Sequence, residues 1–221
     1  PDCLSELRKK MVTSLIRGKQ FYSNRLLGKY WRVILDGTGV ACFEERHCDN
    51  CLYEKRTYKD GRKVTVYYHK VLEAKLILGD KIVVSLGTEF IENERSDVSK
   101  QDCETKAAKR LLERIKKEYP RLPICIQGDA MYATEPMMEI CRLNGWKYIF
   151  SHKEAQQRVL ADNYNLLSLE DGKQKVQGIG AEKGTAIYCN GIGKMAGKTE
   201  IMNVYEKKKK KIIKKQEKTV H

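Results

Sequence analysis

The sequence lacks any uninterrupted apolar run close to the roughly 18 residues that a membrane-spanning helix needs. Its N-terminus, PDCLSELRKK, is polar and lacks the apolar stretch of a secretory signal. Acidic residues are in the minority, with 29 Asp and Glu against 43 Lys and Arg, which gives a formal net charge of +14. These features predict a cytoplasmic protein without a membrane span, and the excess of positive charge indicates a polyanionic partner.

Disulfide bonds are not indicated either, although the sequence contains eight cysteines. The rest of the chain is charge-rich in the manner of cytoplasmic domains, so we expect reduced thiols. One C-x-x-C pair is present, Cys48 and Cys51, but the second pair of a typical zinc module is missing. Cys42, His47 and His69 are further potential ligands nearby. Two interpretations stay open: a zinc site on Cys48, Cys51 and two of these three residues, or a surface loop with incidental thiols.

The hydrophobic pattern predicts an α/β fold in which helices flank a mixed sheet. Gly79-Asp80 is a turn signal between two strands, so we expect the first strands to be antiparallel. Ser99 is the expected N-cap of one helix, and Thr134 with Pro136 predicts the start of another. The expected elements are helices at 4–26, 99–118 and 134–145, strands at 30–36, 63–78, 81–90, 122–129 and 146–151, an irregular insert at 42–62 and short glycine-rich strands over 160–205.

Two of the apolar strands end in an acid. VILDGTGV places Asp36 after a β-branched run, and LPICIQGD places Asp129 after another. Adjacent strand ends would bring the two carboxylates together at one edge of the sheet, where they repel each other unless a cation lies between them. Hard oxygen ligands suit Mg²⁺ or Mn²⁺, and such a site can act on phosphodiesters. The alternative for each Asp is that it merely caps a turn or a helix.

Several segments resemble the catalytic domain of Asp-Asp-Glu transposases of bacterial insertion sequences. They are VILDGTGV, YYHKVLEAKLIL, TEFIENE, KQDCETKAAKRLLERI and LPICIQGDAMYATEPMMEICRLNGWKYIF, and the similarity spans about residues 26 to 205. The resemblance implies a ribonuclease H-like fold with a β-rich insertion near the C-terminus. It also implies DNA strand cleavage and strand transfer that depend on Mg²⁺ or Mn²⁺. Asp36 and Asp129 match the family's first two catalytic acids and metal ligands.

The same resemblance implies particular partners and an order of domains. The partners are DNA, as transposon ends and target, and a second copy of the chain on that DNA, in the bacterial cytoplasm near the nucleoid. We expect an N-terminal helical segment at 1–28, an incomplete catalytic domain at 29–206 and a basic disordered tail at 207–221. The tail carries eight Lys and one Glu, half of the net charge of +14. The predicted DNA-binding residues are Lys153, Lys207, Lys208, Lys209, Lys210 and Lys211.

The family's third acid, a Glu on a late helix, has no counterpart that we can identify. Neither Glu206 nor Glu217 lies in a matching motif, and Glu89, Glu92 and Glu94 are the substitutes considered. Without this carboxylate we expect the chain to be inactive or impaired in strand transfer. The alternatives are an inactive remnant that binds nucleic acid through charge, and a zinc-stabilised interaction module.

Overall fold

The structure is a computed structural model that describes residues 2–151, 158, 162, 165–166, 174–179, 184–193 and 201–208. It divides the chain into two units, Pro1–Ser151 and His152–His221. The second unit contains an antiparallel sheet in the order β7-β8-β9, formed by β7 (Gln174–Ile179), β8 (Gly184–Gly193) and β9 (Ile201–Lys208). Within the described ranges, no helix is long and apolar enough to cross a membrane.

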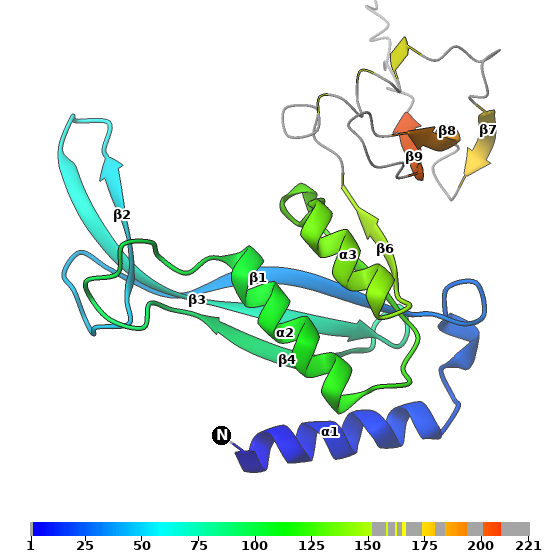
Figure 1. Ribbon diagram of the computed structural model, residues 1–221, viewed down its shortest axis with the longest axis horizontal. Helices are drawn as coiled ribbons and strands as arrows, with labels where there is room; N and C mark the ends of the chain where they lie inside the picture. The colour runs from blue at the N-terminus through cyan, green and yellow to red at the C-terminus, as the bar shows by residue number, and fades with distance from the viewer. Residues whose placement is uncertain are drawn as a thin grey trace, which may run out of the picture. The chain divides into compact units, whose positions relative to one another are not determined.

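The first unit is built on a six-stranded mixed sheet (Figure 1). Its strands are β1 (Trp31–Phe43), β2 (Leu52–Thr57), β3 (Lys63–Ile77), β4 (Val83–Ile91), β5 (Ile124–Gly128) and β6 (Lys147–Phe150). The strand order is β2-β3-β1-β5-β6, and β4 also pairs with β3. β1 to β4 pair in antiparallel fashion, whereas β1 with β5 and β5 with β6 are parallel. The predicted α/β fold with a mixed sheet and helices is therefore confirmed.

Three helices pack against one face of this sheet. α1 (Asp2–Arg17), α2 (Glu104–Glu118) and α3 (Glu135–Leu143) all contribute buried side chains to the core cluster that includes Trp31, Val33 and Leu35 of β1. Since alternate residues of a strand point to opposite faces, Arg32, Ile34 and Asp36 lie on the other face. We call this other side of the sheet the Asp36 face.

Several element boundaries differ from the prediction. α1 ends at Arg17 rather than near residue 26, because Gly18 follows it and the later apolar residues belong to a short 3-10 turn, Tyr22–Asn24. α2 begins at Glu104, with Cys103 rather than Ser99 at the N-cap. The predicted start of α3 is confirmed, with Thr134 at the N-cap and a proline in the first turn.

The predicted irregular insert at 42–62 is wrong for residues 42–43 and 52–57, which are strand, whereas residues 44–51 form a loop and 58–62 a turn. β1 continues to Phe43, and β2 pairs with the first part of β3 from Leu52 to Thr57. The turn at Asp60-Gly61 is confirmed: Gly61 has a φ of +83°, and the Arg62 N–H donates to Asp60 Oδ1 at 3.0 Å. Together β2 and this part of β3 form an arm that projects from the body of the unit (Figure 1).

Candidate active site and metal centre

Asp36 lies in β1, and Asp129 directly follows β5, the parallel neighbour of β1. The β1–β5 register pairs Ile34 with Gln127, and two residues further along each chain come Asp36 and Asp129. Residues two apart on an extended chain share a face, and neighbouring strands are about 4.8 Å apart. Both acids are exposed, and Asp129 keeps an extended backbone beyond the end of β5. From this register we infer that the two predicted acids lie near each other on the Asp36 face.

Glu73 is a third carboxylate of this row, which the sequence analysis missed. It lies on β3 directly opposite Asp36, so the row Glu73, Asp36, Asp129 crosses three adjacent strands on one face. Facing side chains of an antiparallel pair have Cβ atoms about 5 Å apart. Glu73 Oε2 lies 3.7 Å from Lys75 Nζ, whereas the Asp36 side chain forms no hydrogen bond or ion pair with the described residues. The sequence signal for Glu73 is the alternation of side chains along KVTVYYHKVLEAKLI. This alternation shows which residues share a face with Glu73, but it places Glu73 beside Asp36 only once the register to β1 is known.

Glu104, the first residue of α2, reaches the strand beside Asp36 from the helix-covered face. Its carboxylate occupies the space that a Cβ on Gly37 would need. Glu104 is 8% exposed, and its Oε1 accepts a hydrogen bond from Lys70 Nζ while Tyr132 Oη donates to its Oε2 at 3.3 Å. Both oxygens of Glu104 are thus engaged, and we assign it to the support of the site rather than to the row itself.

Tyr132 lies close enough to Glu104, Asp129 and Asp36 for their charges to affect the pKa of its hydroxyl. Burial raises the pKa of Tyr132, and the negative charges of Glu104, Asp129 and Asp36 raise it further. Its hydroxyl therefore stays protonated and acts as a hydrogen-bond donor to Glu104. Asp129 is tied to the same turn, because its Oδ1 accepts the Met131 N–H at 2.9 Å. The capping role considered for Asp129 is thus present, and it uses one of the two carboxylate oxygens.

A second cluster is formed by Cys48, Cys51 and His69. Their ligand atoms all lie within 4.8 Å of one another, which holds for no other group of three or more His, Cys, Asp or Glu among the described residues. The two sulfur atoms are 3.6 Å apart, and His69 Nε2 lies 3.3 Å from Cys48 Sγ and 3.4 Å from Cys51 Sγ. Cys51 is buried and Cys48 half-buried. The acidic row spans three strands, so its outer members are too far apart for such a cluster.

The other two predicted zinc ligands lie outside this cluster. Cys42 faces Tyr68 across the β1–β3 pair, whereas Ala41 faces His69, so Cys42 points to the opposite side of the sheet from His69. The His47 ring stacks on Phe43 with centroids 4.6 Å apart, and Phe43 in turn packs edge-on against His69. His47 therefore borders the cluster without joining it.

Backbone N–H groups surround the two thiols. Burial and the neighbouring Cys51 thiol raise the pKa of Cys48, against the opposing effect of the backbone N–H groups of Asn50 and Cys51. Burial also acts to raise the pKa of Cys51, but the backbone at Cys48 and His47, the Cys48 side chain and the Arg46 cation outweigh it, so the pKa of Cys51 is lowered. Cys51 therefore loses its proton more readily than Cys48, and the deprotonated form is the one that binds metals.

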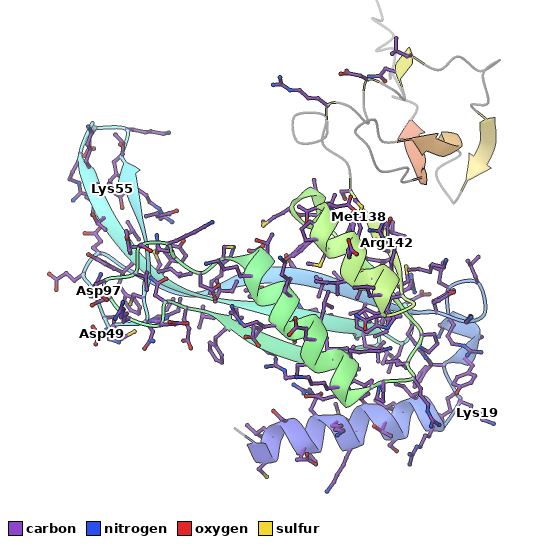
Figure 2. The ribbon with its side chains drawn as sticks, in the orientation of Figure 1. Lys19, Asp49, Lys55, Asp97, Met138 and Arg142 are labelled. Atoms are coloured by element: carbon purple, nitrogen blue, oxygen red, sulfur yellow. The ribbon has the colours of Figure 1, made fainter. Side chains whose placement is uncertain are left out.

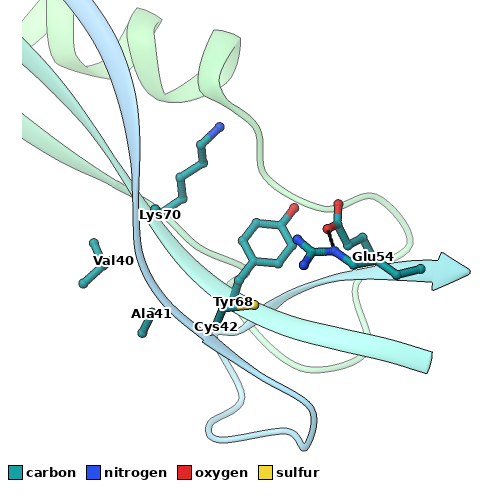
Figure 3. A pocket seen from close by; sticks show the side chains of 8 residues that line it. Val40, Ala41, Cys42, Glu54, Tyr68 and Lys70 are labelled. Carbon is teal, nitrogen blue, oxygen red and sulfur yellow. Dashed lines mark hydrogen bonds and ion pairs between the residues drawn. The ribbon is translucent and has the colours of Figure 1, made fainter. Parts of the chain in front are cut away.

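A hollow of about 520 Å³ opens on the helix-covered face beside Lys70 (Figure 3). Lys70 lies at one end, and Tyr68 and the Arg56–Glu54 ion pair lie at the other. Beyond it, the exposed end of the β2–β3 arm is basic, as Lys55 in Figure 2 illustrates. The lining residues are Gly39, Val40, Ala41, Cys42, Glu54, Arg56, Tyr68 and Lys70.

The remaining predicted residues do not join the acidic row. Glu89 is held by Arg110 and Arg114 at 2.7 and 2.8 Å. Lys207 and Lys208 belong to β9, so the boundary predicted for the disordered tail is wrong for these two residues. Lys153 and the lysines at 209, 210 and 211 lie outside the described residues.

Neither a protein-family model, nor a curated protein, nor a solved structure matches this chain. The two clusters, the charge of the chain and the sequence resemblance are the indications of function that remain.

Proposed function

We propose that this protein is a transposase catalytic domain of the Asp-Asp-Glu type, with a ribonuclease H-like fold, which cuts and joins DNA with Mg²⁺ or Mn²⁺. The observation that carries the proposal is the parallel pairing of β1 with β5, because Asp36 lies in β1 and Asp129 directly follows β5. An exposed pair of acids at this position is unfavourable by itself, because the two charges repel each other. A bound cation would offset this repulsion between the two carboxylates.

The donor set fits a hard divalent cation. Asp36, Asp129 and Glu73 offer carboxylate oxygens only, which suit Mg²⁺ and Mn²⁺ and not a thiolate-seeking metal. When bound, such ions lower the pKa of an attacking water and stabilise the leaving oxygen of a phosphodiester. Asp36 lies in the middle of the row, so it could share a metal ion with Glu73 on one side and with Asp129 on the other. Glu73 is thus our candidate for the third carboxylate.

Basic side chains near the acidic row can bind the phosphates of a DNA substrate. Lys75 lies beside Glu73 on the Asp36 face, and its ammonium can bind a backbone phosphate at the edge of the acidic row. Glu104 and Lys70 position the strand on which Asp36 lies, because Glu104 packs against Gly37. The net charge of +14 supports DNA as the polyanion.

A plasmid-nicking assay tests the proposal. We expect the purified chain to nick supercoiled DNA with Mn²⁺ or Mg²⁺, and Asp36→Asn and Asp129→Asn each to lower the rate at least about 100-fold. Asp80→Asn, an exposed acid in the turn before β4, is the matched control and should leave the rate unchanged. Retained nicking in both variants of the pair would contradict the assignment.

The third carboxylate is tested by two further variants. Glu73→Gln should lower nicking and weaken Mn²⁺ binding measured by calorimetry, whereas Glu104→Gln should mainly lower thermal stability. DNA binding without any metal-dependent nicking would favour the alternative of a nucleic-acid-binding remnant. That outcome would leave the register of the acids intact but remove the catalytic assignment.

A further inference from the structure

The cluster of Cys48, Cys51 and His69 is independent of the acidic row in its chemistry. Sulfur and imidazole nitrogen are ligands for zinc and other soft or borderline metals, not for Mg²⁺. The three residues come from two separate places in the sequence: the C-x-x-C pair lies between β1 and β2, and His69 lies in the middle of β3. The fold has thus brought together ligands that sequence spacing alone left undecided.

The observed distances match one metal ion of tetrahedral geometry. Zn–S bonds of about 2.3 Å and a Zn–N bond of about 2.05 Å require S···S and S···N separations of about 3.8 and 3.6 Å. The measured separations are 3.6 Å between the sulfurs and 3.3 and 3.4 Å from the sulfurs to His69 Nε2. All three therefore agree with a shared ion to within about 0.3 Å. A disulfide would need the sulfurs at about 2.05 Å.

We propose that Cys48, Cys51 and His69 bind a structural zinc ion, with the fourth position taken by solvent or by the neighbouring His47. The ion joins the loop at residues 44–51 to β3. Asn93, two residues beyond β4, also holds this loop: its side chain donates to the Cys51 carbonyl at 2.9 Å, and its carbonyl accepts from the Asn50 side chain at 2.8 Å. The zinc therefore fixes the base of the β2–β3 arm.

Metal analysis of the full chain, purified under reducing conditions, tests the site directly. We expect about one zinc per chain, and a Co²⁺-substituted form with the absorption bands of tetrahedral thiolate ligation. Cys48→Ser, Cys51→Ser and His69→Ala should each weaken metal binding at least about 100-fold, the upper end of the loss seen for residues that merely support a ligand. Cys42→Ser, a neighbouring thiol on the other side of the sheet, is the matched control and should retain the metal.

One variant keeps the test valid if the others fail to fold. His69→Cys should retain metal and raise the sulfur-to-cobalt charge-transfer absorption about 1.5-fold, since three thiolates replace two. Removing the metal with a chelator should also speed trypsin cleavage after the exposed Arg46 in the tethered loop. Absence of zinc and of any cobalt spectrum in the reduced wild-type chain would overturn the proposal, as would equal loss of metal in the Cys42→Ser control.

Discussion

Gly37 shows how a single missing side chain positions the acidic row. Its Cα faces the Glu104 carboxylate so closely that an added Cβ would overlap with Oε1 and Cδ. Gly39, two residues further along the same strand, has no atom near the place of its missing Cβ. The glycines of DGTG therefore differ in role: one makes room for a buried carboxylate beside Asp36, and the other has no such constraint.

Gly37→Ala should displace Glu104 from Lys70 and Tyr132 and lower the free energy of unfolding by about 1–3 kcal/mol, the usual cost of overpacking a filled site. Gly39→Ala is the matched control and should cost less than about 0.5 kcal/mol. Chemical denaturation of both variants measures the difference. Equal destabilisation would mean that strand conformation, and not the contact with Glu104, explains the effect.

At the scale of elements, an ion-pair network joins α2 to β4. Arg110 donates from Nη2 to Asp102 Oδ2 at 2.7 Å and from Nε to Glu89 Oε1 at 2.7 Å, and Arg114 binds the other oxygen of Glu89 at 2.8 Å. Burial acts to raise the pKa of Asp102, but the hydrogen bonds from Arg110 and from the backbone outweigh it, so the pKa is lowered. The charged form of Asp102 is therefore the one that stabilises the fold.

This network predicts a loss of stability in acid. Because the pKa of Asp102 is lower in the folded than in the unfolded chain, its contribution is present above about pH 3.9 and is lost as the pH falls below it. Asp102→Asn should remove about 1 kcal/mol of the stability difference between pH 6 and pH 3, measured by thermal unfolding across that range. Asp97→Asn, whose side chain is 72% exposed, should leave the pH dependence unchanged.

The β2–β3 arm has the composition of a ribbon that binds nucleic acid. Lys55, Lys59 and Arg62 are exposed on it, and the Arg62 guanidinium lies 4.9 Å from the centre of the Tyr58 ring. A two-stranded ribbon fits the major groove of DNA, where basic side chains neutralise phosphates. The zinc proposed at its base would hold the ribbon in a fixed direction relative to β3.

Replacing Lys55, Lys59 and Arg62 by alanine should weaken DNA binding and lower the slope of log affinity against log salt by about 0.9 for each lost phosphate contact. The control replaces three exposed cations on the helices, Lys10, Arg17 and Lys117, by alanine. It therefore has the same net charge as the first triple variant. Fluorescence anisotropy at several salt concentrations separates the two. An equal loss in both triple variants would indicate that only total charge matters.

At the scale of the whole molecule, the sequence predicted what depends on periodicity. The β-branched run before Asp36, the hairpin turn at Gly79-Asp80 and the start of α3 were all predicted from local signals. Glu73 and the zinc cluster could not be assigned in the same way, because both depend on which residues of β1 and β3 face each other. The bulge between Gly39 and Ala41 moves the register by one residue, and this shift places Cys42 on the opposite side of the sheet from His69.

Each of the two clusters takes one residue from β3, and these two residues lie on the same face. His69 and Glu73 are four residues apart on β3, so about 14 Å separates the proposed zinc from the acidic row. Both residues point to the Asp36 face, while Lys70 between them points to the other side and binds Glu104. β3 thus carries the proposed zinc ligand His69, the partner of Glu104, Lys70, and the candidate third carboxylate, Glu73, on a single strand.

The lysines beyond β9 give the last prediction. β9 ends at Lys208, so a deletion from residue 209 removes six lysines and one glutamate and leaves β9 intact. Since a run of lysines binds phosphates through its charge, with little sequence preference, the deletion should lower affinity for all DNA sequences alike and reduce the salt slope. Metal-dependent nicking at saturating DNA should be unchanged, because Asp36, Asp129 and Glu73 all lie in the first unit. A second variant with the six lysines changed to glutamine separates charge from chain length. Unchanged affinity in both variants would exclude this segment from DNA binding and leave the β2–β3 arm as the remaining candidate.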